Sequence, residues 1–215
     1  MSITTELILA RHGQAHCNVA GVVGGPKTCT GLTELGVLQI KALAERLREE
    51  HAQRAVTAVY AGPRQRLRES GRIIADVLRL PLAIETGLDG PRHGAADGRP
   101  WHEVKTAFRG APDSSPGRRW AYGSETWNTY LERATAFLTT LIGRHHGDRI
   151  VLAAHGETII AAHMLLLSLP TGQCGGFVTD HAGLTRWQRN RNRFGDERWL
   201  LATHNDTAHL DGIAG

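Results

Sequence analysis

Short apolar runs alternate with longer amphipathic stretches along this chain of 215 residues. Three apolar runs predict buried strands, because each is short and ends in a polar turn; they lie in 6–13, 55–62 and 149–154. Apolar positions at helical spacing predict helices over 32–51, 64–80, 124–145 and 158–169. Thr33 and Ser124 are the expected N-caps of the first and third helices, since a side-chain oxygen there accepts a backbone hydrogen bond.

The remaining segments are less regular. The stretch 87–116 is rich in glycine, proline and aspartate, and it holds one short predicted helix near 101–108. A short strand is expected at 82–85, and segments 183–190 and 199–204 are expected to pair as a hairpin.

Strands that alternate with helices predict an α/β fold, a three-layer sandwich in which a mainly parallel central sheet is flanked by helices. The absence of a linker or repeat in the sequence predicts one domain over 1–215, with an insertion or lid at about 87–123. We expect this insertion over the carboxyl ends of the strands, which is where such sheets place their ligand site.

Composition narrows the class of protein. Hydrophobic residues make up 41% of the chain and charged residues 21%, as in an ordinary globular protein. No apolar run is long enough to cross a bilayer, and the first residues lack the pattern of a signal peptide. Three cysteines, Cys17, Cys29 and Cys174, argue against a disulfide framework. We therefore expect a cytoplasmic protein without a membrane partner.

Positive charge is carried almost entirely by arginine. The formal net charge is +4, and Lys27, Lys41 and Lys105 are the only lysines. The arginines are scattered rather than gathered in a dense stripe, which predicts no nucleic-acid partner. Arginine binds phosphate and carboxylate groups through paired donors, so the arginines favour an anionic substrate over a merely basic surface.

Two predicted strands end alike, with a histidine followed by a glycine. His12 follows the first strand and His155 follows the strand at 149–154. Arg11 adjoins the first histidine, and Arg66 lies one helical turn beyond the end of the second strand. These strand ends converge in a parallel sheet, so the two histidines and two arginines suit a phosphoryl group, with one histidine as nucleophile.

Several motifs occur along the chain in an order that is typical of a known protein family. They are LILARHGQAHCN, GLTELG, VYAGPRQRLRESG, LAAHGETI and NDTAHL, and they run from about residue 6 to residue 210. With them the chain resembles the phosphatase branch of the histidine phosphatase superfamily, which is also called phosphoglycerate mutase-like.

The resemblance implies roles for individual residues. His12 would become the phosphohistidine, Arg11, Arg66 and His155 would hold the phosphoryl oxygens, and Asn18 would line the same pocket. Gly156 lets the backbone approach the ligand, and Thr30 ends a glycine-rich loop expected at the pocket mouth. The implied substrate is a small phosphorylated metabolite, with no metal and no cofactor.

One departure concerns the general acid. The family carries a glutamate where an ungapped comparison places Gly90, within the text GLDGPRHGAADG. Asp89 lies one position earlier and Asp97 falls on a later acidic position. Three alternatives stay open: a shifted loop brings Asp89 to the leaving oxygen, Asp97 serves instead, or no acid is present and the leaving group needs little protonation.

Two rival functions also stay open. A phosphoglycerate mutase-type phosphotransferase would use the same phosphohistidine, and a non-catalytic module that binds a phosphorylated ligand would explain the missing glutamate at Gly90. The sequence also leaves a homodimer open. Hydrolysis is the function we expect.

Overall fold

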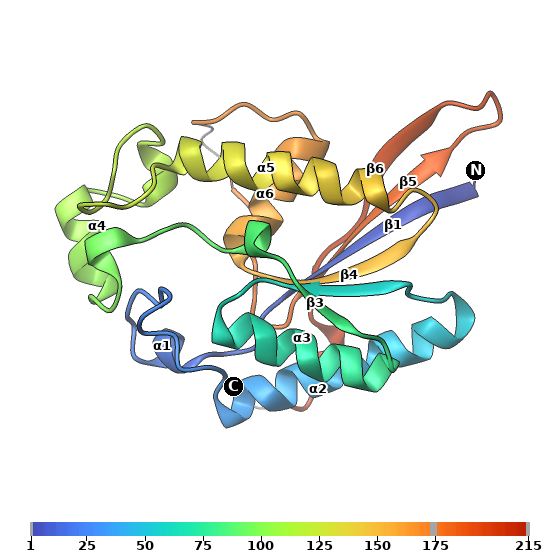
Figure 1. Cartoon of the computed structure of the whole chain (residues 1–215), viewed down its shortest axis with the longest axis horizontal. Helices are drawn as coiled ribbons and strands as arrows, with labels where there is room; N and C mark the ends of the chain where they lie inside the picture. Colours follow the sequence, from blue (N-terminus) through green and yellow to red (C-terminus); the bar gives the residue numbers. More distant parts are fainter. Residues whose placement is uncertain (1, 173–175, 214–215) are drawn as a thin grey trace.

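The computed structural model describes residues 2–172 and 176–213, so Cys174 lies outside the described residues. Its centre is a six-stranded sheet with the order β3-β2-β4-β1-β5-β6 (Figure 1). The strands are β1 (Ser2–Arg11), β2 (Ala58–Ala61), β3 (Leu82–Ile84), β4 (Arg149–Ala154), β5 (Leu184–Arg191) and β6 (Glu197–Asp206). The helices are α1 (His16–Val19), α2 (Glu34–Gln53), α3 (Gln65–Leu78), α4 (Trp101–Phe108), α5 (Trp127–Arg144) and α6 (Gly156–Leu166).

The sheet is mainly parallel, as the sequence predicts. Strand β1 pairs in parallel with β4, β4 with β2, and β2 with β3. The C-terminal hairpin adds two antiparallel pairings, of β5 with β1 and of β6 with β5. The predicted α/β sandwich is therefore confirmed, with a hairpin that extends one edge of the sheet.

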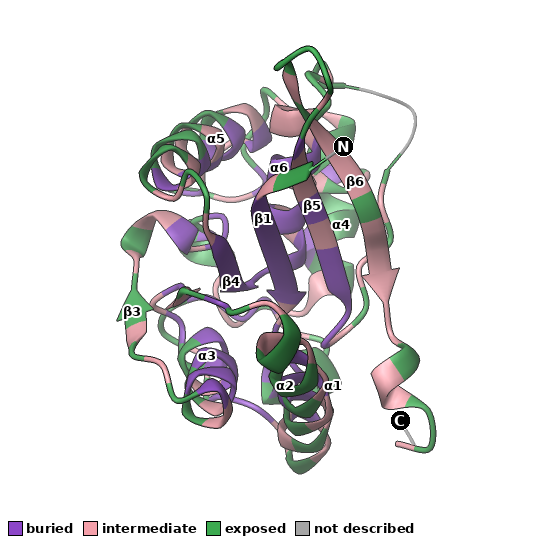
Figure 2. Ribbon diagram, turned by 90° about the vertical axis from the view of Figure 1, so that its right-hand side faces the viewer, coloured by how far each residue is buried: buried purple, intermediate pink, exposed green. Residues whose placement is uncertain are grey.

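Both faces of the sheet are buried. Alternation along β1 sends Leu7 and Leu9 into the core under α5 and α6, whereas Ile8 and Ala10 join the core with α2 and α3. Figure 1 shows these two helix pairs on opposite sides of the sheet. The central strands are buried and the helices expose only their outer faces (Figure 2). This two-sided burial is why the predicted strands are continuous apolar runs.

The expected cap at Ser124 is wrong. Helix α5 begins at Trp127, and its N-cap is Thr126, whose hydroxyl accepts a hydrogen bond from the amide of Thr129 at 3.1 Å. The hydroxyl of Ser124 instead accepts from the amide of Ala121, which closes the preceding turn. The expected cap at Thr33 is confirmed, because its hydroxyl accepts from the amide of Gly36 at 3.0 Å.

Other boundaries differ by a few residues. Strand β1 begins at Ser2, because its first residues extend beyond the apolar run to pair with β5. Helix α6 begins at Gly156, directly after His155, and ends at Leu166 rather than spanning 158–169. The short helix α1 was not expected, since four residues are too few to show a helical period.

The segment 87–123 lies at the carboxyl ends of the central strands, where Figure 1 places α4. Its residues Val104, Phe108 and Trp120 form a small core with Ala96 and with Val23 of the loop after α1. The segment is thus anchored on that loop, at the end of the sheet where the ligand site is expected. Among the described residues, no helix has both the length and the apolarity needed to span a membrane.

Candidate active site

His12 and His155 lie side by side because their strands are neighbours in register. Arg11 at the end of β1 is paired with Ala154 at the end of β4, and the amide of His12 donates to the carbonyl of Ala154 at 3.0 Å. Each histidine is the next residue after its strand. Their ring centroids are 5.4 Å apart, in an edge-to-face arrangement.

Arg66 joins the two histidines. Its Nε donates to Nε2 of His12 at 3.1 Å, and its Nη2 lies 3.3 Å from Nδ1 of His155. Its Nη1 donates to the carbonyl of Gly24 at 2.9 Å. The structure therefore brings together three of the predicted site residues, all buried, from β1, α3 and β4.

The hydrogen bonds of His12 define its tautomer. Nδ1 lies 2.8 Å from the carbonyl oxygen of Gly13, and a carbonyl only accepts, so Nδ1 carries the proton. Nε2 therefore presents its lone pair. Burial, followed by the charges of Arg66 and Arg11, holds the pKa of His12 well below its ordinary value. His12 is thus a neutral imidazole whose Nε2 lone pair accepts the hydrogen bond from Arg66.

Contact between two glycines fixes the loop that carries His12. A Cβ on Gly13 would lie 2.3 Å from the carbonyl oxygen of Gly36, and a Cβ on Gly36 would lie 2.0 Å from that of Gln14. The hydroxyl of Thr33 also contacts the carbonyl of Gln14, at 3.2 Å. The LTELG motif thus acts by holding the RHG turn in place.

Arg11 lies beside the start of α6. Its Nη1 donates to the carbonyl of Thr179, and a Cβ added to Gly156 would lie 3.8 Å from its Nε. Within the described residues that Nε is buried without a hydrogen-bond partner. Burial lowers the pKa of the guanidinium from its ordinary high value, although Glu157 and Asp180 oppose the shift.

His181 is a site residue that the sequence analysis missed. Its ring centroid lies 5.7 Å from that of His12, and the amide of Ala182 donates to the carbonyl of His12 at 3.2 Å. Burial, then Arg11, lowers its pKa to about 4. No motif marked this residue, because its position depends on the antiparallel pairing of β5 with β1.

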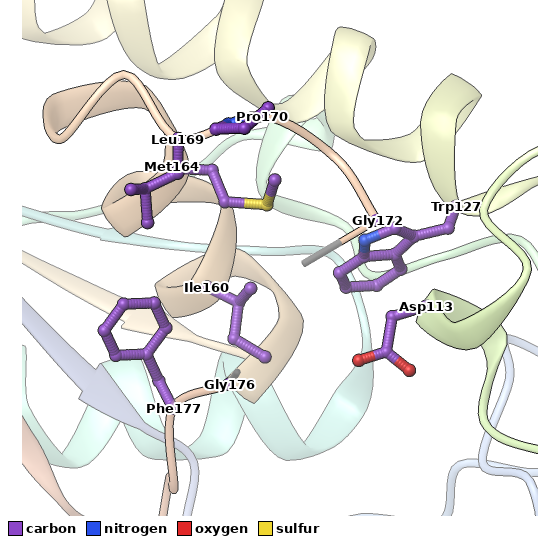
Figure 3. A pocket seen from close by; sticks show the side chains of 9 residues that line it. All are labelled: Asp113, Trp127, Ile160, Met164, Leu169, Pro170, Gly172, Gly176 and Phe177. Atoms are coloured by element: carbon purple, nitrogen blue, oxygen red, sulfur yellow. The ribbon is translucent and has the colours of Figure 1, made fainter. Parts of the chain in front are cut away.

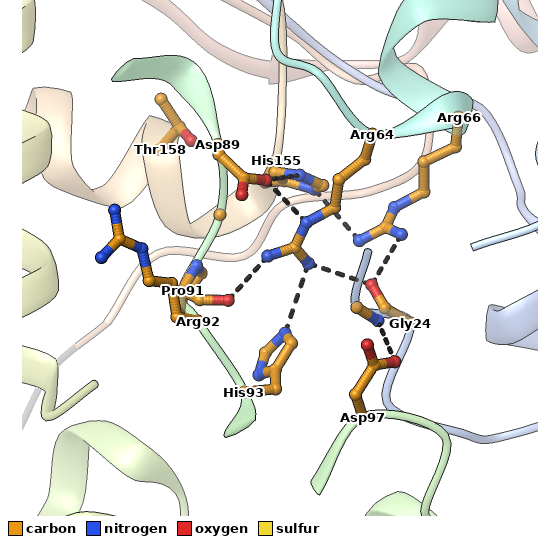
Figure 4. A network of polar contacts seen from close by, with 12 residues as sticks. Gly24, Arg64, Arg66, Asp89, Pro91, Arg92, His93, Asp97, His155 and Thr158 are labelled. Carbon is orange, nitrogen blue, oxygen red and sulfur yellow. Dashed lines mark hydrogen bonds and ion pairs between the residues drawn. The ribbon is translucent and has the colours of Figure 1, made fainter. Parts of the chain in front are cut away.

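Arg64 is a second residue that was not expected in the site. Its Nε donates to Oδ1 of Asp89 at 2.6 Å, its Nη1 to the carbonyl of Gly24 at 2.9 Å, and its Nη2 to that of Pro91 at 2.6 Å (Figure 4). The same Asp89 oxygen lies 4.0 Å from Nε2 of His155. Asp89 is thus brought to the edge of the site, but as the partner of a buried arginine.

The other predicted residues have mainly structural contacts. Asp97 accepts from the amides of Gly25 and Lys27, both at 3.0 Å. It also accepts from the hydroxyl of Thr28. Burial opposes the effect of these bonds, which nevertheless lower the pKa of Asp97. Asp97 therefore fixes the loop that begins at Gly24.

Asn18 and Thr30 make no hydrogen bond to the three buried site residues among the described contacts. Asn18 is exposed, and its Oδ1 caps α1 by accepting from the amide of Ala15 at 3.0 Å. Thr30 is exposed, and the hydrogen bonds of the described residues do not connect it to His12, Arg66 or His155. The proposed contact of Asn18 with a ligand therefore rests on the family resemblance, and that of Thr30 rests on the glycine-rich loop that it ends.

An apolar cavity of about 220 Å³ lies between α5 and α6 (Figure 3). Its wall includes Trp127, Ile160, Met164 and Phe177, and Asp113 supplies one carboxylate. The site histidines and arginines are not part of this wall. Among the described residues, its wall has no cationic side chain for a phosphate and shares no residue with the candidate phosphate site.

Within the described residues, no three His, Cys, Asp or Glu side chains are grouped so as to hold a metal ion. The guanidinium groups of Arg66 and Arg11 lie close to His12 and lower its pKa. Such a site neutralises an anion through arginine donors.

Comparisons with known proteins agree with this geometry. A profile described as the histidine phosphatase superfamily (branch 1) matches residues 7–207. A metal-independent phosphoserine phosphatase from Arabidopsis thaliana is 26% identical over 99% of this chain and 86% of its own length.

Solved structures share the fold. A mycobacterial glucosyl-3-phosphoglycerate phosphatase in complex with VO3 has a TM-score of 0.77 at 24% identity, over 93% of this chain and 98% of that one. A mutant phosphoserine phosphatase from Entamoeba histolytica, in complex with phosphoserine, has a TM-score of 0.77 at 20% identity, over 96% and 99% of the two chains.

Proposed function

The chain belongs to the histidine phosphatase superfamily and is a phosphatase, and we propose that it hydrolyses a small phosphorylated metabolite through a phosphohistidine formed on His12. One observation carries the proposal. Around His12, three buried nitrogen atoms lack a hydrogen-bond partner among the described residues: Nε of Arg11, Nε2 of His155 and Nε2 of His181. Buried polar groups are normally paired, so these donors fit a phosphoryl group that binds between them.

The charges of the pocket suit a phosphate dianion. Arg66 and Arg11 supply two guanidinium groups, and α6 begins at Gly156 with its free amides toward the same end of the sheet. His155 has a pKa held well below its ordinary value by burial, then by Arg66 and Arg64, so it is a neutral hydrogen-bond donor. Together these groups would orient the phosphorus toward Nε2 of His12 and stabilise the charge on its oxygens.

Two steps then account for hydrolysis. The lone pair of Nε2 forms the N–P bond as the P–O bond to the leaving group breaks, and the leaving group keeps that electron pair. The proton on Nδ1 stays on His12, held by the carbonyl of Gly13. Water then attacks phosphorus, the N–P electron pair returns to Nε2, and the protons of the water leave with inorganic phosphate and solvent.

A trapping experiment tests this function. Wild-type protein is mixed with a labelled phosphoester, quenched in alkali and digested, and the modified peptide is sequenced by mass spectrometry. The label is expected on His12 and absent from the His12→Ala variant. Phosphate release without label on His12 would refute the nucleophile.

The same preparation separates hydrolysis from phosphotransfer. In ¹⁸O-labelled water, hydrolysis places ¹⁸O in the released phosphate, whereas a mutase moves phosphate between positions of phosphoglycerate. Phosphoserine and glucosyl-3-phosphoglycerate, for which the relatives are named, are suitable first substrates. Transfer that outpaces release would favour the mutase, and binding without either reaction would favour a non-catalytic module.

A further inference from the structure

Position 90, where the family carries its glutamate, is packed against His155. A Cβ on Gly90 would lie 2.9 Å from Cδ2 and 3.2 Å from Nε2 of the His155 ring. The backbone of residue 90 is therefore packed against this imidazole. A side chain at this position would have to displace the ring, so the chain has no room for the missing carboxyl group there.

The loop that carries Asp89 is also held in place. Arg133 donates from Nη1 to the carbonyl of Asp89 at 3.2 Å and from Nη2 to that of Gly90 at 3.1 Å. Arg64 donates to the carbonyl of Pro91 at 2.6 Å. Arg133 is itself fixed by two 3.0 Å bonds to the carboxylate of Glu125. The carbonyls of three successive residues thus accept hydrogen bonds from buried or half-buried arginines. These hydrogen bonds oppose a shift of the loop.

The carboxylate of Asp89 is committed to Arg64. The Arg64 side chain is only 2% exposed, and Asp89 is its only ion-pair partner among the described residues (Figure 4). Moving Asp89 toward a leaving oxygen would leave a buried guanidinium unpaired, which is costly.

Neighbouring titratable groups do not replace it. His93 is neutral, because burial and then Arg64 lower its pKa to about 4. Asp97 accepts three hydrogen bonds that favour its ionised form. Glu157, in the first turn of α6, is a further carboxylate at this end of the sheet, and a variant tests it below.

We propose that this site accepts phosphoryl donors whose leaving group departs as a stable anion, namely phosphoanhydrides, acyl phosphates and aryl phosphates, and that Asp89 is a positioning residue rather than the proton donor. The inference rests on the proposed phosphohistidine chemistry. The P–O bond breaks as Nε2 of His12 bonds to phosphorus, the leaving oxygen keeps the electron pair, and it takes a proton from solvent after release if it needs one.

The test compares leaving groups on the wild-type protein. Values of kcat/KM are measured for a series of substituted phenyl phosphates, for acetyl phosphate, and for the alkyl esters phosphoserine and glycerol phosphate. We expect the alkyl esters to react about 10²–10⁴-fold more slowly than nitrophenyl phosphate, the range that a general acid contributes. Comparable kcat/KM values for phosphoserine and nitrophenyl phosphate would overturn the inference.

Two variants test whether Asp89 or Glu157 acts as a general acid. Asp89→Asn and Glu157→Gln should each leave the ratio of aryl to alkyl kcat/KM unchanged, whatever they do to both rates together. A selective loss of alkyl ester turnover in either variant would identify that residue as the acid and refute the proposal. The trapping assay distinguishes failure of the proposed function from failure of this inference. If nitrophenyl phosphate does not label His12, the proposed phosphohistidine is refuted. If alkyl and aryl esters label His12 equally well, only the inference about leaving groups is refuted.

Discussion

Nε of Arg66 donates a hydrogen bond to Nε2 of His12 across 3.1 Å, so the guanidinium covers the nitrogen that we propose attacks phosphorus. A substrate therefore has to take over this donor with one of its phosphoryl oxygens. The exchange keeps the charge of Arg66 paired, first with the imidazole lone pair and then with the phosphate. It also releases the lone pair only when a phosphoryl group is present.

Replacing His12 by alanine removes the nucleophile. We expect kcat to fall by at least about 10⁴-fold, as when other covalent nucleophiles are deleted. The fold should persist, because the backbone bond from His12 to Ala154 does not need the imidazole. Steady-state kinetics and circular dichroism check the two parts. His16→Ala is the matched control, since His16 is exposed on α1, and an equal loss in that variant would contradict the assignment.

Replacing Arg66 by lysine keeps the positive charge but loses the planar set of donors that reaches His12, His155 and Gly24. We expect kcat/KM to fall by about 10²-fold, the effect of losing one preorganised donor to the transition state. Arg68→Lys changes an exposed arginine of the same helix and should leave kcat/KM near the wild-type value. Similar losses in the two variants would mean that Arg66 acts through general charge alone.

Much of this site can be predicted from sequence, because it depends on strand order. The apolar runs before His12 and His155 predict parallel strands whose carboxyl ends converge, and the structure pairs Arg11 with Ala154 at these ends. Arg66 follows from the spacing after β2. The contact between Gly13 and Gly36 explains why two motifs distant in sequence occur together, although their spacing alone could not show the contact.

The missed residues depend on irregular backbone. Arg64 and Arg66 are two residues apart, and only the loop geometry shows that both reach the carbonyl of Gly24. The pairing of Arg64 with Asp89 depends on how residues 86–93 turn, and no periodicity encodes that turn. His181 follows a segment without a hydrophobic repeat. Side chains placed by loops and by hairpin register therefore lie beyond what the patterns predict.

Acidification should destabilise the protein. The pKa of His163 is lowered from its ordinary value of 6.5 to about 4, mainly by burial and also by the charge of His204. The unfolded chain therefore takes up protons that the folded chain excludes, so stability is complete above pH 6.5 and falls as the pH drops toward 4. For His163, which is fully buried, the loss between pH 7 and pH 5 is about 2 kcal/mol.

Urea unfolding at several pH values measures this slope. His93 and His181 have pKa values lowered to about 4 by burial and neighbouring arginines, so they act in the same direction. His163→Asn should reduce the slope, whereas His16→Ala should leave it as in the wild type. A free energy of unfolding that stays constant from pH 7 to pH 5 would contradict the buried neutral state of these histidines.

Replacing Glu6 by glutamine separates stability from activity. Glu6 is buried in β1 and pairs with Arg149 at 2.8 Å, Arg186 at 2.9 Å and Arg54 at 3.2 Å. Burial works against the negative charge, but the bonds from Arg186 and Gln188 prevail and lower the pKa of Glu6. Removing the negative charge of Glu6 leaves the buried guanidinium groups without one of their carboxylate partners, although Glu50 still pairs with Arg149 and Arg186.

We expect Glu6→Gln to lose about 3 kcal/mol of unfolding free energy, near the lower end for a broken buried ion pair. Glu45→Gln breaks an exposed pair with Arg48 and should leave the free energy of unfolding close to the wild-type value, because solvent screens the pair. Because Glu6 lies in the middle of β1 and His12 follows the carboxyl end of the strand, kcat should be unchanged under conditions where the variant is folded. If kcat falls although the variant is fully folded, the ion pairs of Glu6 also help to position the site at the end of the strand.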